Sequence, residues 1–193
     1  MKKFLIVLIV ILLVVAGISY RVVRGSARDK GSKSRIVAVN TTEIEGLPID
    51  SGKLKFIASS EDTNGAFAIV ERTQDPCYKT TWHRHDNYDE SFYVLEGTWT
   101  VQIRDKVSEF PAGSYVLIPR GTPHGQGNFT HRPVKLLVIV APAGFEQFYR
   151  GRAELFKTKG SNKEELEKGL EALRRKYIQI INYTWDIAKE CRE

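Results

Sequence analysis

The sequence predicts an all-β domain of the sandwich or barrel type over residues 36–155. First, short runs rich in β-branched and aromatic residues recur in this region, among them GAFAIVERT, SFYVLEG and VKLLVIVAP. Second, turn-forming residues separate these runs, as in EDTNG and RGTPHGQGN. Third, no long helical periodicity interrupts the series, which argues against parallel βαβ units. Many short strands with turns between them are typical of all-β barrels and sandwiches.

The first twenty residues differ in character from this domain. Two lysines precede an uncharged, almost wholly apolar run of seventeen residues from Phe4 to Tyr20. This arrangement is typical of a secretory signal, and its length is at the short end of what spans a bilayer. The run contains the small residues Ala16, Gly17 and Ser19 near its end but no clean A-x-A cleavage motif, so residues 1–20 are interpreted as either a signal peptide or a membrane anchor. We expect the β domain to be secreted or membrane-anchored and extracytoplasmic, although the basic flank after the run favours the opposite topology.

The formal net charge of +6 is concentrated near the N-terminus. Residues 1–35 carry eight basic side chains and one acidic side chain, and residues 21–35 are interpreted as a basic linker. Residues 36–193 carry twenty-one basic and twenty-two acidic side chains. A nearly neutral domain has no general basic face, so we expect no nucleic-acid partner. The membrane is an expected partner of the N-terminal segment if that segment is not cleaved.

Residues 156–193 are expected to form a C-terminal helix and tail. Ser161 and Glu164 have the spacing of a capping box, and three leucines after them share one helix face. The β-branched and aromatic run IQIINYTW predicts that this helix ends near Lys176. We expect the helix to pack on the outside of the barrel rather than to act as a lid or a dimer contact.

The two cysteines, Cys77 and Cys191, lie far apart and form no C-x-x-C motif. Their pairing would require a fold that brings them together and an oxidising compartment. The sequence alone favours two unrelated thiols.

The stretch HRHDNYDESFYVLEG holds the first candidate metal ligands. His83 and His85 are two residues apart, so on a strand their imidazoles share one face. The intervening DNYD is turn-forming, and it lets Glu90 begin the next strand and point back toward the pair. A carboxylate among apolar neighbours is costly unless it is paired or bound to a cation. His124, in RGTPHGQGN, supplies a third imidazole.

Three histidines and one glutamate form a mixed nitrogen and oxygen donor set. Such a set suits one first-row divalent transition metal, Fe, Mn, Ni, Co, Cu or Zn, with one or two coordination positions left open. Gln126 and Asn128 alternate with His124 onto one face, and Phe92 shares the face of Glu90, so these three residues are candidates for the pocket lining. For Asn128 a role in stabilising a turn is equally supported.

Two patterns carry a resemblance to a known family. The first stretch fits H-x-H-x4-E-x6-G through His83, His85, Glu90 and Gly97. The second fits G-x5-P-x-G-x2-H-x3-N through Gly113, Pro119, Gly121, His124 and Asn128. Both are cupin patterns, and over roughly residues 42–155 the sequence is similar to the small single-domain cupins often described as quercetin-dioxygenase-like. The resemblance implies a cupin double-stranded β-helix, which is a jelly-roll barrel. One position departs from the pattern, because Cys77 stands where a glycine commonly opens the first motif.

The resemblance also implies the site and the activity. In such cupins the four residues matching His83, His85, Glu90 and His124 bind one metal inside the barrel. The implied activity is that of a metal-dependent dioxygenase on a small aromatic or enolisable substrate, with Glu90 as the catalytic base, and the implied assembly is a homodimer. The spacing itself shows no O₂ chemistry. A non-catalytic module that captures a small ligand or a metal, and a metal-dependent isomerase or decarboxylase, remain as alternatives.

Overall fold

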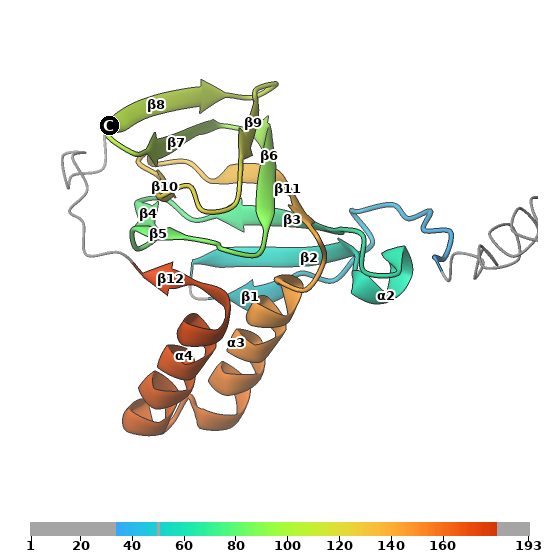
Figure 1. Cartoon of the computed structure of the whole chain (residues 1–193), viewed down its shortest axis with the longest axis vertical. Helices are drawn as coiled ribbons and strands as arrows, with labels where there is room; N and C mark the ends of the chain where they lie inside the picture. Colours follow the sequence, from blue (N-terminus) through green and yellow to red (C-terminus); the bar gives the residue numbers. More distant parts are fainter. Residues whose placement is uncertain (1–33, 50, 181–193) are drawn as a thin grey trace, which may run out of the picture. The chain divides into compact units, whose positions relative to one another are not determined.

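Antiparallel strands form most of the region between residues 47 and 141 in the computed structural model of the protein (Figure 1). The structure describes residues 34–49 and 51–180. The predicted signal or anchor, residues 1–20, and most of the predicted linker lie outside the described residues. Within the described part of the chain, no helix is long and apolar enough to cross a membrane.

The described elements are mainly strands up to β11, with the short helix α2 between β2 and β3, and two longer helices and the strand β12 follow. The strands are β1 (Leu47–Ile49), β2 (Gly52–Ala58), β3 (Ala68–Gln74), β4 (Tyr78–Lys79), β5 (His83–Arg84), β6 (Asp89–Glu96), β7 (Thr98–Ile103), β8 (Lys106–Pro111), β9 (Tyr115–Ile118), β10 (His124–Asn128), β11 (Val134–Ala141) and β12 (Gln179–Ile180). The helices are α2 (Ser60–Thr63), α3 (Glu146–Lys159) and α4 (Lys163–Tyr177).

The strands form two sheets that face each other (Figure 1). One sheet has the order β1-β2-β3-β11-β6-β9 and the other has the order β12-β5-β10-β7-β8, with β4 also paired to β10. The paired strands described in both sheets are antiparallel. The predicted jelly-roll class of fold is therefore confirmed.

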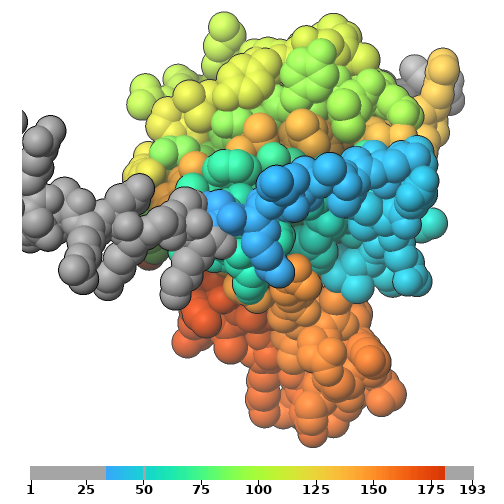
Figure 2. Space-filling view, turned by 90° about the vertical axis from the view of Figure 1, so that its right-hand side faces the viewer, coloured from blue at the N-terminus to red at the C-terminus, as the bar shows by residue number. Residues whose placement is uncertain are grey.

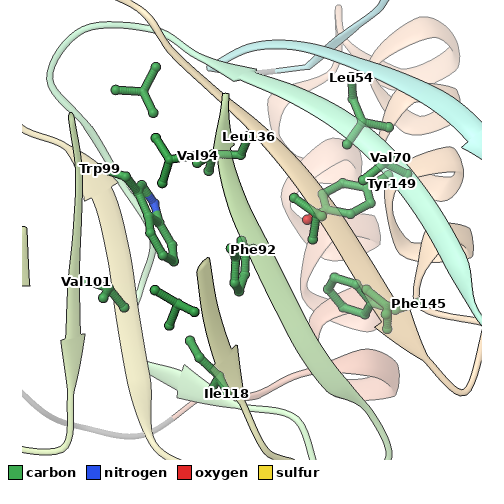
Figure 3. Close-up of a cluster of buried hydrophobic side chains, with 14 of the residues drawn as sticks. Leu54, Val70, Phe92, Val94, Trp99, Val101, Ile118, Leu136, Phe145 and Tyr149 are labelled. Carbon is green, nitrogen blue, oxygen red and sulfur yellow. The ribbon is translucent and has the colours of Figure 1, made fainter. Parts of the chain in front are cut away.

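The core lies between the two sheets, and period-two alternation selects its residues. In β11 every second side chain is buried, and these residues are Val134, Leu136, Val138 and Val140. Figure 3 shows Phe92 of β6 facing Trp99 of β7 across the barrel, with their ring centroids 4.6 Å apart. Burial of one such side chain contributes about 1.5–3 kcal/mol, so the alternating pattern fixes which face of each strand points inward.

Two helices, rather than the single predicted helix, follow the barrel. They lie side by side and project from the β domain (Figure 2). Gly151 of α3 faces Leu173 of α4, and Gly169 of α4 faces Leu155 of α3, at distances that leave no room for a β-carbon without movement of the leucines. The sequence analysis did not predict α3, because its apolar residues lack a clear helical period.

The start of α4 also differs from the prediction. Asn162, and not Ser161, caps the helix, because the Asn162 side chain accepts a hydrogen bond from the backbone N–H of Glu165. Both residue types are good caps, so a shift by one position costs little. The C-terminal end at Tyr177 lies one residue from the predicted end.

Cys77 corrects the expectation of two unrelated thiols, because it is disulfide-bonded in the structure. Cys191 is the only other cysteine of the chain and lies outside the described residues. The physical reason is topological: β12, at the C-terminal end of the described residues, pairs with β5 in the sheet that also contains β4. Cys77 also has a left-handed backbone (φ 64°), the conformation that glycine adopts most easily, at the position where the cupin pattern commonly has glycine.

Candidate metal centre

Four buried side chains from both sheets converge inside the barrel. Their ligand atoms all lie within 4.8 Å of one another, and we name this group the ligand cluster: His83, His85, Glu90 and His124. His83 of β5 and His124 of β10 are directly paired neighbours in one sheet, whereas Glu90 is the second residue of β6 in the opposite sheet. The structure thus brings together the four residues proposed from the sequence.

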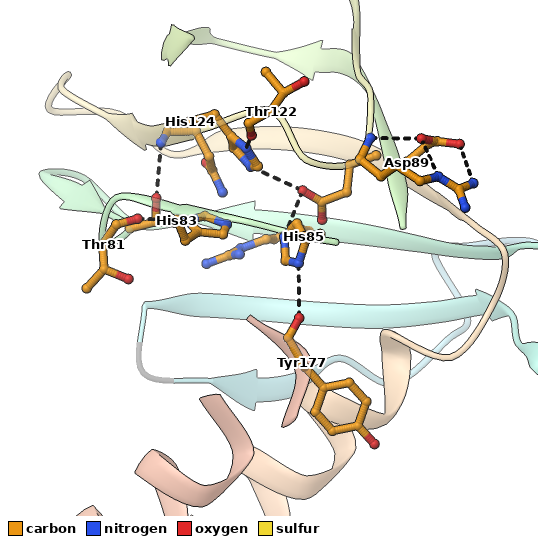
Figure 4. A network of polar contacts seen from close by, with 12 residues as sticks. Thr81, His83, His85, Asp89, Thr122, His124 and Tyr177 are labelled. Atoms are coloured by element: carbon orange, nitrogen blue, oxygen red, sulfur yellow. Dashed lines mark hydrogen bonds and ion pairs between the residues drawn. The ribbon is translucent and has the colours of Figure 1, made fainter. Parts of the chain in front are cut away.

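Each histidine of the ligand cluster is oriented by a backbone carbonyl (Figure 4). Nδ1 lies 2.7 Å from the oxygen of Thr81 in His83 and 2.9 Å from the oxygen of Thr122 in His124. Nδ1 of His85 lies 3.2 Å from the carbonyl oxygen of Tyr177. A carbonyl oxygen only accepts, so Nδ1 carries the proton and Nε2 keeps its lone pair for a metal.

Glu90 completes the cluster from the other sheet. Its Oε2 lies 3.2 Å from Nε2 of His85 and 3.4 Å from Nε2 of His124. Both Nε2 atoms are buried and make no hydrogen bond. Buried polar atoms are normally satisfied, and these two nitrogens point at a carboxylate oxygen. The donor set and its unsatisfied atoms fit a divalent cation among the four side chains.

The protonation states also fit metal binding. Burial, reinforced by the charges of His124 and His85, lowers the pKa of His83 to about 3, so this imidazole is neutral at physiological pH. Burial disfavours ionisation of Glu90, but the charges and side-chain contacts of His85 and His124 together outweigh burial and hold the pKa of Glu90 well below its usual value. Burial alone would lower the pKa of His85, yet the Glu90 carboxylate raises it. A cation that binds in place of the proton held between His85 and Glu90 would meet an ionised carboxylate.

The ligand cluster lies in the wall of a cavity of about 160 Å³. Three of the four cluster residues, His83, His85 and Glu90, line this cavity, as do Phe92 and Gln126. The oxygen Oε1 of Gln126 accepts hydrogen bonds from Trp99 Nε1 at 2.9 Å and from Gln74 Nε2 at 2.5 Å, so the amide is fixed in orientation. The structure therefore places two of the three candidate lining residues at the cavity.

Asn128 does not line this cavity. It is fully buried, and its Nδ2 donates to the carbonyl oxygens of Asp75 and Arg132 at 3.1 and 2.7 Å. Its Oδ1 accepts from the backbone N–H and the hydroxyl of Thr130. These bonds hold the turn between β10 and β11.

The segment between β9 and β10, which leads to His124, is held at two points. Arg120 pairs with Asp89, Nη2 to Oδ2 at 2.7 Å, and this hydrogen-bonded contact lowers the pKa of Asp89 to about 2 (Figure 4). The backbone N–H of Gly121 donates to the carbonyl oxygen of His85 at 2.7 Å. Arg120 is thus the ion-pair partner of Asp89.

The C-terminal helices also contribute to the cavity, which sequence reasoning missed. Phe145, at the start of α3, packs edge-on against His85 with ring centroids 4.5 Å apart. The other lining residues from this part of the chain are Phe148, Tyr149, Arg152, Arg174 and Ile178. The expectation that this segment only packs outside the barrel is wrong, because the helices close one side of the cavity. The adjacent aromatic residues Phe148 and Tyr149 in GFEQFYRG were the sequence signal that could have indicated this contribution to the cavity.

Comparisons with known proteins find a similarity to one domain family. Residues 72–140 match the model of the Cupin domain family. This match confirms the cupin resemblance for residues 72–140, and the ligand cluster could hold a metal.

Relatives of established and of unknown function share this domain. Quercetin 2,3-dioxygenase of Bacillus subtilis (strain 168) is 26% identical over 96 residues, which are 50% of this chain and 28% of that protein. The uncharacterized protein YdbB of the same organism is 40% identical over 58 residues, which are 30% of this chain and 50% of YdbB. The match therefore spans half or less of the length of these relatives.

Solved structures with a similar fold include the polyketide cyclase RemF of Streptomyces resistomycificus. Its TM-score is 0.49 at 23% identity, with 55% of this chain and 79% of RemF covered. A variant of oxalate decarboxylase OxdC of Bacillus subtilis has a TM-score of 0.46 at 21% identity, with 54% of this chain and 29% of OxdC covered.

Proposed function

We propose that this protein is a mononuclear metal-dependent oxidoreductase of the dioxygenase type that acts on a small enolisable or aromatic substrate. The observation that carries the proposal is the ligand cluster, whose four buried donors converge at the wall of a cavity. The similarity to quercetin 2,3-dioxygenase supports the dioxygenase assignment. The cofactor is one divalent transition metal held by His83, His85, Glu90 and His124.

The size of the cavity favours a small substrate. Its volume is about 160 Å³, whereas sites for drug-sized ligands occupy about 300–1,000 Å³. A cavity of about 150 Å³ holds one benzene molecule. A single ring or a short chain is therefore the expected substrate, and a three-ring flavonol would require the cavity to open.

Each residue of the site has a physical role in this proposal. A bound divalent ion would supply Lewis-acid polarisation of a substrate oxygen. Glu90 is ionised and buried at the cavity wall, so it can accept the proton of an enolisable substrate. Phe92 and Phe145 form apolar walls that exclude water from the reacting atoms.

We also propose that the domain is extracytoplasmic, as the apolar N-terminal run predicted. The disulfide of Cys77 supports this location, because disulfides persist in oxidising compartments. In intact cells treated with a maleimide before lysis, Cys77 should remain unlabelled until a reductant is added. Complete labelling without a reductant would contradict the proposal.

Metal analysis and O₂ uptake test the proposed function together. The wild-type protein should contain about one transition-metal ion per chain, and His124→Ala should contain none, because it removes one of four ligands. His131→Ala is the matched control, since His131 lies outside the ligand cluster. Acetylacetone and catechol are suitable small substrates, and the wild-type protein should consume O₂ in step with their loss.

Each other outcome has a distinct meaning. Substrate loss without O₂ uptake would favour an isomerase or decarboxylase. Stoichiometric metal without turnover of any tested substrate would favour a ligand-capture module. Absence of metal in a folded, reconstituted wild-type protein would overturn the metalloenzyme proposal.

A further inference from the structure

Gln126 presents a side-chain amide to the cavity beside the ligand cluster. It lies on β10, it is only 5% exposed, and it lines the cavity together with His83 and Glu90. His124 stands two residues earlier on the same strand, so the two side chains share one face, with about 7 Å between their Cα atoms. The amide is therefore a close neighbour of the metal ligands.

The orientation of this amide is set by a group that can only donate. Trp99 Nε1 lies 2.9 Å from Oε1 of Gln126, and an indole nitrogen donates a hydrogen bond but cannot accept one. The reversed amide would place two donors against each other. Trp99 is fully buried and packs against Phe92, with ring centroids 4.6 Å apart, so its own position is also fixed (Figure 3).

Both acceptor positions of the amide oxygen are occupied. Gln74 Nε2 donates to Oε1 of Gln126 at 2.5 Å, in addition to the bond from Trp99, and a carbonyl oxygen has two lone pairs. The oxygen of Gln126 is therefore not available to a metal ion. The group that the side chain offers to the cavity is its nitrogen Nε2, whose hydrogens bind an acceptor and repel a cation.

No described residue accepts a hydrogen bond from Nε2 of Gln126. The remaining hydrogen bonds of Gln126 within residues 34–49 and 51–180 involve its backbone. Nε2 of His124 is fully enclosed by the protein, whereas Nε2 of Gln126 is not. The amide nitrogen thus retains access to the cavity that its residue lines.

Any occupant of the cavity meets this donor and the ligand cluster together. The cavity has a volume of about 160 Å³, and a cavity of about 150 Å³ holds one benzene molecule, so a single small molecule fills it from wall to wall. A buried donor left unpaired by its ligand weakens binding by about 5- to 150-fold. The cavity therefore favours a molecule with an acceptor facing Gln126.

We propose that Gln126 selects the substrate by donating a hydrogen bond from Nε2 to one of its oxygen atoms, a carbonyl oxygen or an oxyanion. The substrate then carries two oxygens, one for Gln126 and one for the ligand cluster, as in a small hydroxyketone or diketone. The oxygen at the ligand cluster rests on the proposed function, whereas the hydrogen bond to Gln126 does not.

The first test compares two probes of the same shape that differ in one acceptor. Cyclohexanone and methylenecyclohexane are titrated into the full chain, once zinc-loaded and once after treatment with a chelator. In the metal-free protein only cyclohexanone should strongly shift the side-chain amide signal of Gln126 in nitrogen–proton correlation NMR spectra, because only its oxygen accepts from Nε2. The signal of Gln102 is the internal control, since Gln102 is fully buried but does not line the cavity.

The second test measures the affinities of both probes by calorimetry. Their ratio is compared between proteins, which removes the difference in hydration between the probes. It should favour cyclohexanone about 5- to 150-fold more in the wild type than in Gln126→Met, whose side chain has a similar length but no donor. Gln102→Met is the matched control and should leave the ratio unchanged. If Gln126→Met fails to fold because Trp99 loses its acceptor, the amide signal of the wild type still decides the question.

Three results would overturn the inference. They are cyclohexanone that leaves the Gln126 signal unmoved or does not bind, a ratio that is unchanged in folded Gln126→Met, and a shift that appears only with zinc, which would mean that the ion holds the oxygen. The expected shift and ratio without O₂ uptake would support Gln126 and count against the dioxygenase proposal alone. O₂ uptake with neither effect would count against Gln126 alone.

Discussion

Replacing Glu90 by glutamine is expected to remove stoichiometric metal binding and to abolish turnover. The substitution keeps the shape of the side chain but removes the negative charge that faces His85 and His124. Loss of an outer-shell partner typically lowers metal affinity about 10- to 100-fold, so loss of a direct, charged ligand should exceed that range. Turnover should fall further, because an amide cannot accept the substrate proton.

The matched control for this substitution is Glu96→Gln. Glu96 lies on the same strand, β6, but it is exposed and pairs with Lys135. Metal content measured by elemental analysis should be unchanged in Glu96→Gln and close to zero in Glu90→Gln. Full metal occupancy in Glu90→Gln would show that three histidines suffice and that Glu90 is not a ligand.

Replacing Gly127 by alanine is expected to cause a large loss of stability. Gly127 lies in β10, and a β-carbon there would approach the backbone oxygen of Tyr78 to 2.3 Å and Cα of Lys79 to 3.0 Å. The obstacle is the backbone of the paired strand β4, which a rotamer change cannot move. Overpacking usually costs about 1–3 kcal/mol, and this position should lie at the upper end of that range.

Thermal unfolding of the metal-free protein measures this cost. A loss of about 3 kcal/mol corresponds to a fall in Tm of roughly 6–12 °C for a chain of this size. His124 begins the same strand, so metal affinity should fall as well. Gly46→Ala is the control, because a β-carbon there meets only the Lys53 side chain at ordinary distance. A Tm for Gly127→Ala within about 2 °C of the wild type would contradict the argument.

The barrel and the ligand cluster could be predicted because their signals are local. Alternation of apolar and polar residues identifies the inward faces of the strands. His83, His85 and Glu90 lie close together in the sequence, and their side chains also converge in the folded chain. Arg72 was invisible to the same reasoning. In the run AIVERTQ both faces carry polar residues, so periodicity does not tell that Arg72 lies on the buried face with Val70 and Gln74.

The contributions of the C-terminal segment depend on tertiary structure. The group of Tyr177 that contacts His85 is its backbone carbonyl, which any residue type would supply. The disulfide of Cys77 likewise requires knowledge of where β12 pairs, and cysteine connectivity does not follow from spacing.

The pairing of β12 with β5 links the metal centre to the order in which the chain is made. The ribosome delivers β1 to β11 first, and the residues that orient His85 and flank His83 arrive later, with Tyr177 and β12. A nascent barrel can hold all four ligand side chains while Nδ1 of His85 still has no carbonyl acceptor. The complete site requires the chain up to Ile180, so we expect metal loading with native affinity only after synthesis has passed that residue.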